Sequence, residues 1–139
     1  MKRFTLFAAF AVALTVSVAF AGAASSAKNS VLIRHQTAHC HAWSFDGGRF
    51  LAAAKGTIAR GATITFTNND VMPHKVFEKS GPAAIFKGSP LLAKIGAKVT
   101  VAFPKAGVYV FGTKPGEDYM KGIVTTGADN VLTLKVTVR

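Results

Sequence analysis

The most conspicuous shortage in this 139-residue sequence is cysteine, of which there is one. A single thiol excludes an internal disulfide, and with it the class of small secreted domains that disulfides hold together. Cys40 is therefore buried and inert, paired with another chain, or bound to a ligand. Its neighbours favour a ligand, because Cys40 lies between His39 and His41 in "AHCHAW", with His35 just upstream.

Acidic residues are also scarce, with 6 Asp and Glu against 17 Lys and Arg and a formal net charge of +11. The basic residues are scattered, with no run of five and no cluster interleaved with aromatic residues, so the sequence does not predict nucleic-acid binding. The charge predicts association with an acidic partner protein or an anionic surface. The sequence has no Ser-His-Asp set, no Gly-x-Ser-x-Gly and no carboxylate pair on separate strands, so we expect a protein that is not an enzyme.

A long hydrophobic run occurs only at the N-terminus. Lys2 and Arg3 precede "FTLFAAFAVALTVSVAFAGA", an Ala-rich stretch that ends in small residues, as a secretory signal peptide does. The alternative is a membrane anchor, since roughly 20 apolar residues can span a bilayer. The small residues favour cleavage, so we assign residues 1–24 to a signal peptide and 25–139 to one exported domain, periplasmic or extracellular. Without Lys2 and Arg3 the net charge falls from +11 to +9.

Helical periodicity is nearly absent from the rest of the chain, which consists of short alternating runs separated by Gly, Pro and Asn. In "GATITFTNND", residues 61–70, Ile64 and Phe66 fall on one face and the threonines on the other. "PKAG" joins two further runs, which predicts a hairpin or a tight corner between sheets. Only "SPLLAKIG", residues 89–96, suggests a helical turn. Several short strands with such turns predict an all-β sandwich or barrel.

Two stretches resemble the cupredoxins, the small blue-copper sandwiches. "FTNNDVMPHKVF", residues 66–77, is similar to the segment in which a Pro-His pair supplies the first copper histidine. "FPKAGVYVFGTKPGEDYMKGIV", residues 103–124, resembles the last hairpin and its ligand loop. The resemblance implies a cupredoxin-like Greek-key β-sandwich of about seven to eight strands that binds copper. It also implies a role in electron transfer or copper handling.

The ligand loop departs from the family pattern of Cys, His and Met. The position expected for Cys after "YVF" is Gly112, the expected His falls near Pro115, and Met120 remains. By the resemblance, His74 and Met120 carry over as ligands, whereas one thiolate and at least one imidazole are missing. Those two donor types are the ones that a trigonal copper site requires.

The segment "AHCHAW" contains both missing donor types. In the family the turn after the first strand lies at the copper end, so residues 38–42 can supply them if "VLIRH" is that strand. In a regular strand the histidines flanking Cys40 face one way and Cys40 the other, so which of the three bind stays open. The predicted ligands are His39, Cys40, His41, His74 and, more weakly, Met120.

His35 is expected to be a surface or core residue rather than a ligand, and Trp43 and Phe45 are expected in the core. Three other interpretations of the function of this chain remain. The first is a metal-free binding module with a basic surface. The second is a sandwich with a structural zinc held by the same Cys and His residues. The third is an open copper site that catalyses redox reactions.

Overall fold

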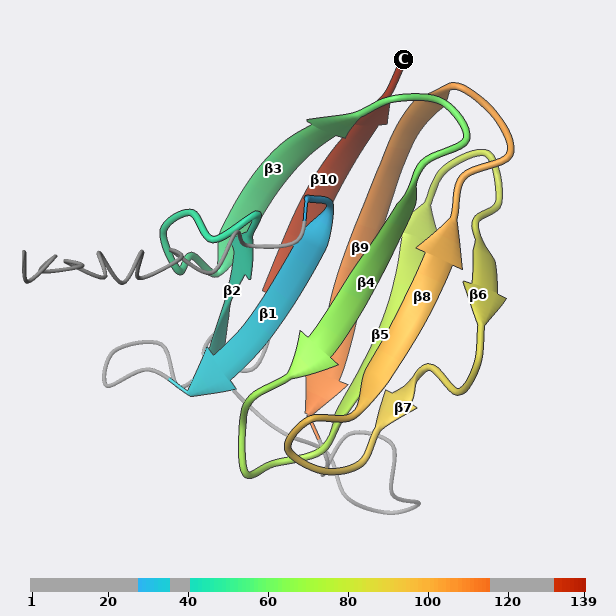
Figure 1. Cartoon of the computed structure of the whole chain (residues 1–139). Coiled ribbons are helices and arrows are strands. Elements are labelled where there is room, and N and C mark those ends of the chain that lie inside the picture. Colours follow the sequence, from blue (N-terminus) through green and yellow to red (C-terminus); the bar gives the residue numbers. More distant parts are fainter. Residues whose placement is uncertain (1–27, 36–40, 116–131) are drawn as a thin grey trace, which may run out of the picture.

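The alternating runs of the sequence form ten strands in the computed structural model, which describes residues 28–35, 41–115 and 132–139 (Figure 1). The assigned signal peptide lies outside these residues. The strands are β1 Ser30–His35, β2 His41–Phe45, β3 Ala53–Ile58, β4 Thr63–Asn68, β5 His74–Ser80, β6 Ile85–Lys87, β7 Leu91–Leu92, β8 Lys98–Ala102, β9 Gly107–Pro115 and β10 Leu132–Val138. Across the described ranges there is no helix that could span a membrane.

The strands form two five-stranded sheets, with the orders β2-β1-β4-β8-β6 and β3-β10-β9-β5-β7. The all-β sandwich expected from the sequence is therefore confirmed. There are more strands than the seven to eight expected, in part because β6 and β7 are only three and two residues long. The "PKAG" segment is a corner between sheets, since β8 lies in the first sheet and β9 in the second.

The helical turn suggested by "SPLLAKIG" is a wrong prediction. Leu91 and Leu92 form β7 instead, and their backbone pairs with Lys75 and His74 on the edge of β5. Leu92 is fully buried in the core between the sheets. Ladder hydrogen bonds and burial have overridden the local sequence preference of this segment.

The core lies between the two sheets and follows the alternation of the strands. Ile64 and Phe66 of β4 are buried, and so are the inward residues of the last strand, Leu132, Leu134, Val136 and Val138. Trp43 is buried as expected, and its indole Nε1 donates a hydrogen bond to the Thr133 carbonyl at 3.1 Å. Phe45 is partly buried and packs against the core. Because each strand buries one face, the register of the strands is fixed.

One end of this sandwich gathers the residues of interest. Figure 1 shows β1, β4 and β9 running toward the same end of the molecule. There His35 ends β1, His41 begins β2 and pairs with His35, and His74 begins β5. Histidines that are distant in the sequence are therefore brought to one end by the strand order.

Candidate metal centre

Two histidine rings from different segments meet at this end. The ring centroids of His41, from the β1–β2 hairpin, and of His74, from the Pro-His motif, lie 4.8 Å apart. Both side chains are buried. The ring of His35 lies 5.7 Å from that of His41 on the other side, and His35 is exposed. The structure thus brings together the two segments that the sequence had assigned to one site.

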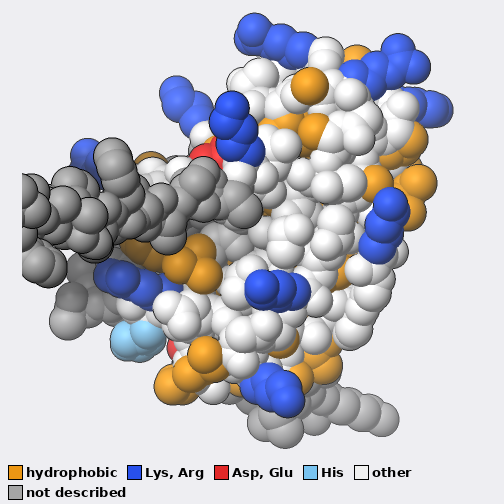
Figure 2. Space-filling model, in the orientation of Figure 1, with side chains coloured by type: hydrophobic (Ala, Val, Ile, Leu, Met, Phe, Trp, Pro, Cys, Tyr) orange, Lys and Arg blue, Asp and Glu red, His pale blue; other side chains and the backbone are white. Residues whose placement is uncertain are grey.

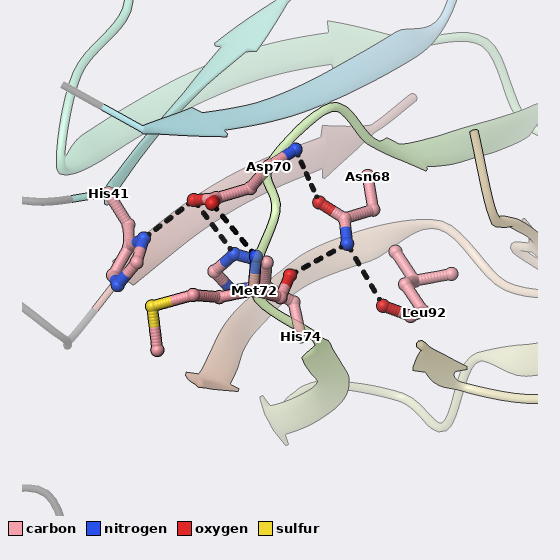
Figure 3. Close-up of polar contacts among 6 residues, drawn as sticks. All are labelled: His41, Asn68, Asp70, Met72, His74 and Leu92. Atoms are coloured by element: carbon pink, nitrogen blue, oxygen red, sulfur yellow. Dashed lines mark hydrogen bonds and ion pairs between the residues drawn. The ribbon is translucent and has the colours of Figure 1, made fainter. Parts of the chain in front are cut away.

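The loop between β4 and β5 is held by the side chain of Asn68. Its amide Nδ2 donates to the carbonyls of Met72 and Leu92, at 2.9 and 3.0 Å. Its Oδ1 accepts a 2.8 Å hydrogen bond from the backbone N–H of Asp70 (Figure 3). Asn68 is fully buried. These bonds fix the turn that presents Asp70 and His74 to the hairpin.

Asp70 connects the two buried histidines. Its Oδ2 lies 2.7 Å from His41 Nδ1 and 3.2 Å from His74 Nε2, and its Oδ1 accepts from the Met72 N–H at 3.0 Å. Burial raises the pKa of Asp70. The hydrogen bonds from Met72, His41 and His74, with the charge of His41, outweigh burial and lower that pKa below its usual value. An ionised carboxylate only accepts hydrogen bonds, so His41 Nδ1 and His74 Nε2 are the donors.

A second group of possible metal ligands includes the exposed residue His35. One donor atom each from His35, His41 and Asp70 lies within 4.8 Å of the others. Sequence reasoning missed this grouping, because it expected His35 to be a surface or core residue rather than a ligand and gave Asp70 no role beyond ending the "FTNND" turn. The signal that could have found Asp70 is its position, between the strand-ending Asn68 and the Pro-His pair.

Three of the predicted ligands lie outside the described residues. These are His39, Cys40 and Met120, and their roles stay predictions. His41 directly follows Cys40 in the chain.

The position expected to have lost the family's cysteine, Gly112, does not face the histidines. A Cβ at Gly112 would meet Phe77 Cζ at 3.0 Å and the side chain of Lys79, on the outer side of the sheet. The next residue, Thr113, is buried and pairs with Val76, which lies on the same face of β5 as His74. Of Gly112 and Thr113, only Thr113 therefore faces the interior on the side of His74. Its side chain carries a hydroxyl, whereas the cysteine of the family's ligand loop carries a thiol.

Comparison with known proteins agrees with a copper protein of this architecture. Residues 48–127 match the family described as copper binding proteins, plastocyanin/azurin family. This match covers more than half of the chain, so the chain belongs to that family and copper is its cofactor. The match contains Asp70 and His74, whereas His35 and His41 precede it. No curated protein sequence matches the chain.

Solved structures with a similar fold share little sequence with this chain. A purple cupredoxin from Nitrosopumilus maritimus is 19% identical, with 81% of this chain and 100% of that chain covered and a TM-score of 0.46. A mutant of amicyanin in its reduced state is 18% identical, with 79% and 82% covered and a TM-score of 0.43. A cysteine protease inhibitor from Entamoeba histolytica is 15% identical, with 62% and 85% covered and a TM-score of 0.41.

The described side chains fit copper in donor type. Imidazole nitrogens bind copper well, and His41 and His74 place two such rings side by side. A soft sulfur donor, which a blue-copper centre needs, has to come from Cys40 or a methionine. The described His and Asp side chains supply nitrogen and oxygen donors, and Met72 of the β4–β5 loop is a described residue that carries a thioether sulfur (Figure 3).

Proposed function

We propose that the chain is an exported copper-binding protein that handles copper, with its metal centre at the end of the sandwich where His41 and His74 meet. The ligands come from the His-Cys-His segment and the Pro-His motif, namely His39, Cys40, His41 and His74, with Met120 as a weaker ligand. The observation that carries this proposal is the 4.8 Å separation of the His41 and His74 rings. Copper bound there can change oxidation state or pass to a partner.

Copper handling is favoured over electron transfer by the nature of the described donors. Thr113 rather than a cysteine stands at an inward position of β9, and the His and Asp side chains grouped with His41 offer nitrogen and oxygen. His35 is exposed beside them, which suits a site that must load and release its metal. The expected partner is an acidic copper-trafficking or redox protein, because the chain is strongly basic.

Electron transfer is the second candidate, and one observation favours it. His41 and His74 are buried and share hydrogen bonds to one carboxylate, so their rings are held in place. A rigid ligand set suits an ion that changes its oxidation state without changing its geometry. This role needs the thiolate of Cys40 as a ligand.

Metal titration of the chain without residues 1–24 tests the proposed function. We expect one equivalent of copper to bind and to displace zinc, since nitrogen and oxygen sites generally bind Cu²⁺ more tightly than Zn²⁺. Failure to take up copper would support the metal-free module, and zinc that resists an equal amount of copper would support a structural zinc site.

The visible spectrum of the copper-loaded protein separates the two roles. A thiolate bound to Cu(II) gives an intense charge-transfer band, which imidazole and carboxylate ligands do not give. If Cys40 binds copper, this band is present in the natural chain and absent from Cys40→Ser. A copper-loaded natural chain without the band excludes Cys40 as a ligand of Cu(II) and leaves the histidines as the centre.

A further inference from the structure

Asp70 lies at the end of the sandwich where His41 and His74 meet. A copper site made of imidazole and sulfur ligands does not require such a carboxylate. Its carboxylate is buried, although an ionised carboxylate is costly to bury unless it is paired. It reaches His41 at 2.7 Å and His74 at 3.2 Å through the same oxygen, Oδ2 (Figure 3). A negative charge placed among histidines is also what a divalent cation needs.

We propose that His35, His41 and Asp70 form a site of two imidazoles and one carboxylate that holds a divalent ion, with Cu(II) as its natural occupant. Asp70 would then be a metal ligand that still accepts hydrogen bonds from His74 and Met72. His41 would bind the ion through Nδ1 with its proton on Nε2, so that the ion takes the place of the Nδ1 proton that Asp70 otherwise accepts. This inference rests on the proposed function, since it names ligands of the same copper centre. It adds a carboxylate and an exposed histidine to that centre, and it assigns the oxidation state that the site prefers.

The geometry allows one ion to contact all three residues. Bonds from nitrogen and oxygen to such an ion are about 2.0–2.2 Å, so two of its ligands lie at most about 4.4 Å apart. The donor atoms of His35, His41 and Asp70 all lie within 4.8 Å of one another. The largest gap exceeds this limit by about 0.4 Å, and His35 is the exposed member of the three.

His74 supports the carboxylate from the opposite side. Its Nε2 donates to Asp70 Oδ2 at 3.2 Å, while the Met72 N–H donates to Oδ1 at 3.0 Å. The carboxylate is therefore held at both oxygens before any ion arrives. Such partners orient a ligand and strengthen metal binding.

The donor types predict which oxidation state binds more tightly. Soft thiolate and thioether ligands select Cu(I), whereas imidazole and carboxylate suit divalent ions. The negative charge of Asp70 also favours the ion with the higher charge, because electrostatic attraction grows with charge and is screened little at a buried site. Removal of this charge should therefore weaken Cu(II) binding more than Cu(I) binding.

The variant Asp70→Asn tests this inference, with Asp46→Asn as its matched control. Asparagine keeps the shape of the side chain but removes its charge. Asp46 accepts a hydrogen bond from the Ser30 N–H at the opposite end of β1, so the control makes the same change far from the histidines. We measure Cu(II) affinity by competition with a chelator, and Cu(I) affinity under reducing conditions.

We expect Asp70→Asn to lower the Cu(II) affinity by more than about 100-fold, which exceeds the usual effect of losing a supporting residue. The Cu(I) affinity should fall by a smaller factor, and Asp46→Asn should change neither. Equal losses for the two oxidation states, or an unchanged Cu(II) affinity, would overturn the role of Asp70 as a ligand. Copper uptake by the natural chain would still stand in that case, so the proposed function would survive.

A second variant keeps the test decisive if Asp70→Asn does not fold. His35 is exposed, so His35→Ala should leave the sandwich intact. Pulsed electron paramagnetic resonance of the Cu(II) protein counts coordinated imidazoles. The spectrum of His35→Ala should show one imidazole fewer than that of the natural chain, together with a weaker Cu(II) affinity. The same imidazole count and affinity in both proteins would exclude His35 and overturn the proposed site.

Discussion

At the scale of single residues, one carboxylate organises the metal end of this protein. Asp70 accepts hydrogen bonds from two buried histidines of different segments, and the turn fixed by Asn68 presents it to them. Without the carboxylate, both imidazoles would lose a partner in a buried setting, where an unpaired polar group is costly. The arrangement holds the rings in place before any metal is bound.

His74→Ala should weaken copper binding at least about tenfold while the sandwich still folds, because His74 either binds the metal or holds the carboxylate beside it. The matched control is Lys75→Ala, since Lys75 is the next residue of β5 and its side chain is exposed. Copper titration of both variants checks this expectation, and circular dichroism verifies their folding. A folded His74→Ala protein with the copper affinity of the natural chain would remove His74 from the centre.

The candidate site shows how far residue-level reasoning from sequence reaches. His74 stands in a local motif, and His41 stands beside the only thiol, so both attracted notice. Asp70 was assigned no role and His35 was not expected to bind, because their importance comes from a distance between segments that no local pattern encodes. Proximity of this kind follows from the order of the strands in the sheets.

At the scale of strands, alternation predicted most of the sandwich. β4 and β10 bury every second residue, which is a local signal that can be read from a few residues. β7 was missed because two residues are too short a run for any period, and its structure comes from pairing with β5. Local patterns thus identify strands with a clear apolar alternation, whereas strands without one, such as β3 with its sequence AAKGTI and the two-residue β7, were not predicted.

The orientation of β9 leads to a prediction about where a thiolate can join the histidines. In a Cys40→Ser background, Thr113→Cys should give the copper-loaded protein an intense charge-transfer band, because Thr113 faces the interior and pairs with Val76 beside His74. Gly112→Cys is the matched control. A side chain there points toward Phe77 and Lys79, away from the histidines.

Visible spectra of the two copper-loaded variants check this prediction about β9. The band should be present in the protein with Thr113→Cys and absent from the protein with Gly112→Cys. A band of equal strength in both would mean that the copper lies elsewhere, and a band only with Gly112→Cys would reverse the assigned orientation.

At the scale of the whole molecule, positive charge dominates. The chain has 17 Lys and Arg against 6 Asp and Glu, and Figure 2 shows Lys and Arg side chains spread over the visible face rather than gathered in one patch. A field of this kind acts at long range and alters how fast charged molecules arrive, more than it alters the fold. It should therefore affect the rate at which copper is delivered from a charged donor.

We predict opposite effects of salt on copper uptake from donors of opposite charge. Uptake of Cu(II) from an anionic chelate, such as its nitrilotriacetate complex, should slow as salt rises from about 10 mM to about 300 mM. Uptake from a cationic ethylenediamine complex should become faster. The reason is screening, since the distance over which charges act falls from roughly 30 Å at 0.01 M to roughly 10 Å at 0.1 M salt.

Stopped-flow measurement at a series of salt concentrations gives both rates, with the ligand exchange of each chelate measured alone as the control. Rates that change in the same direction for both donors would show that the net positive charge of the chain does not govern the encounter.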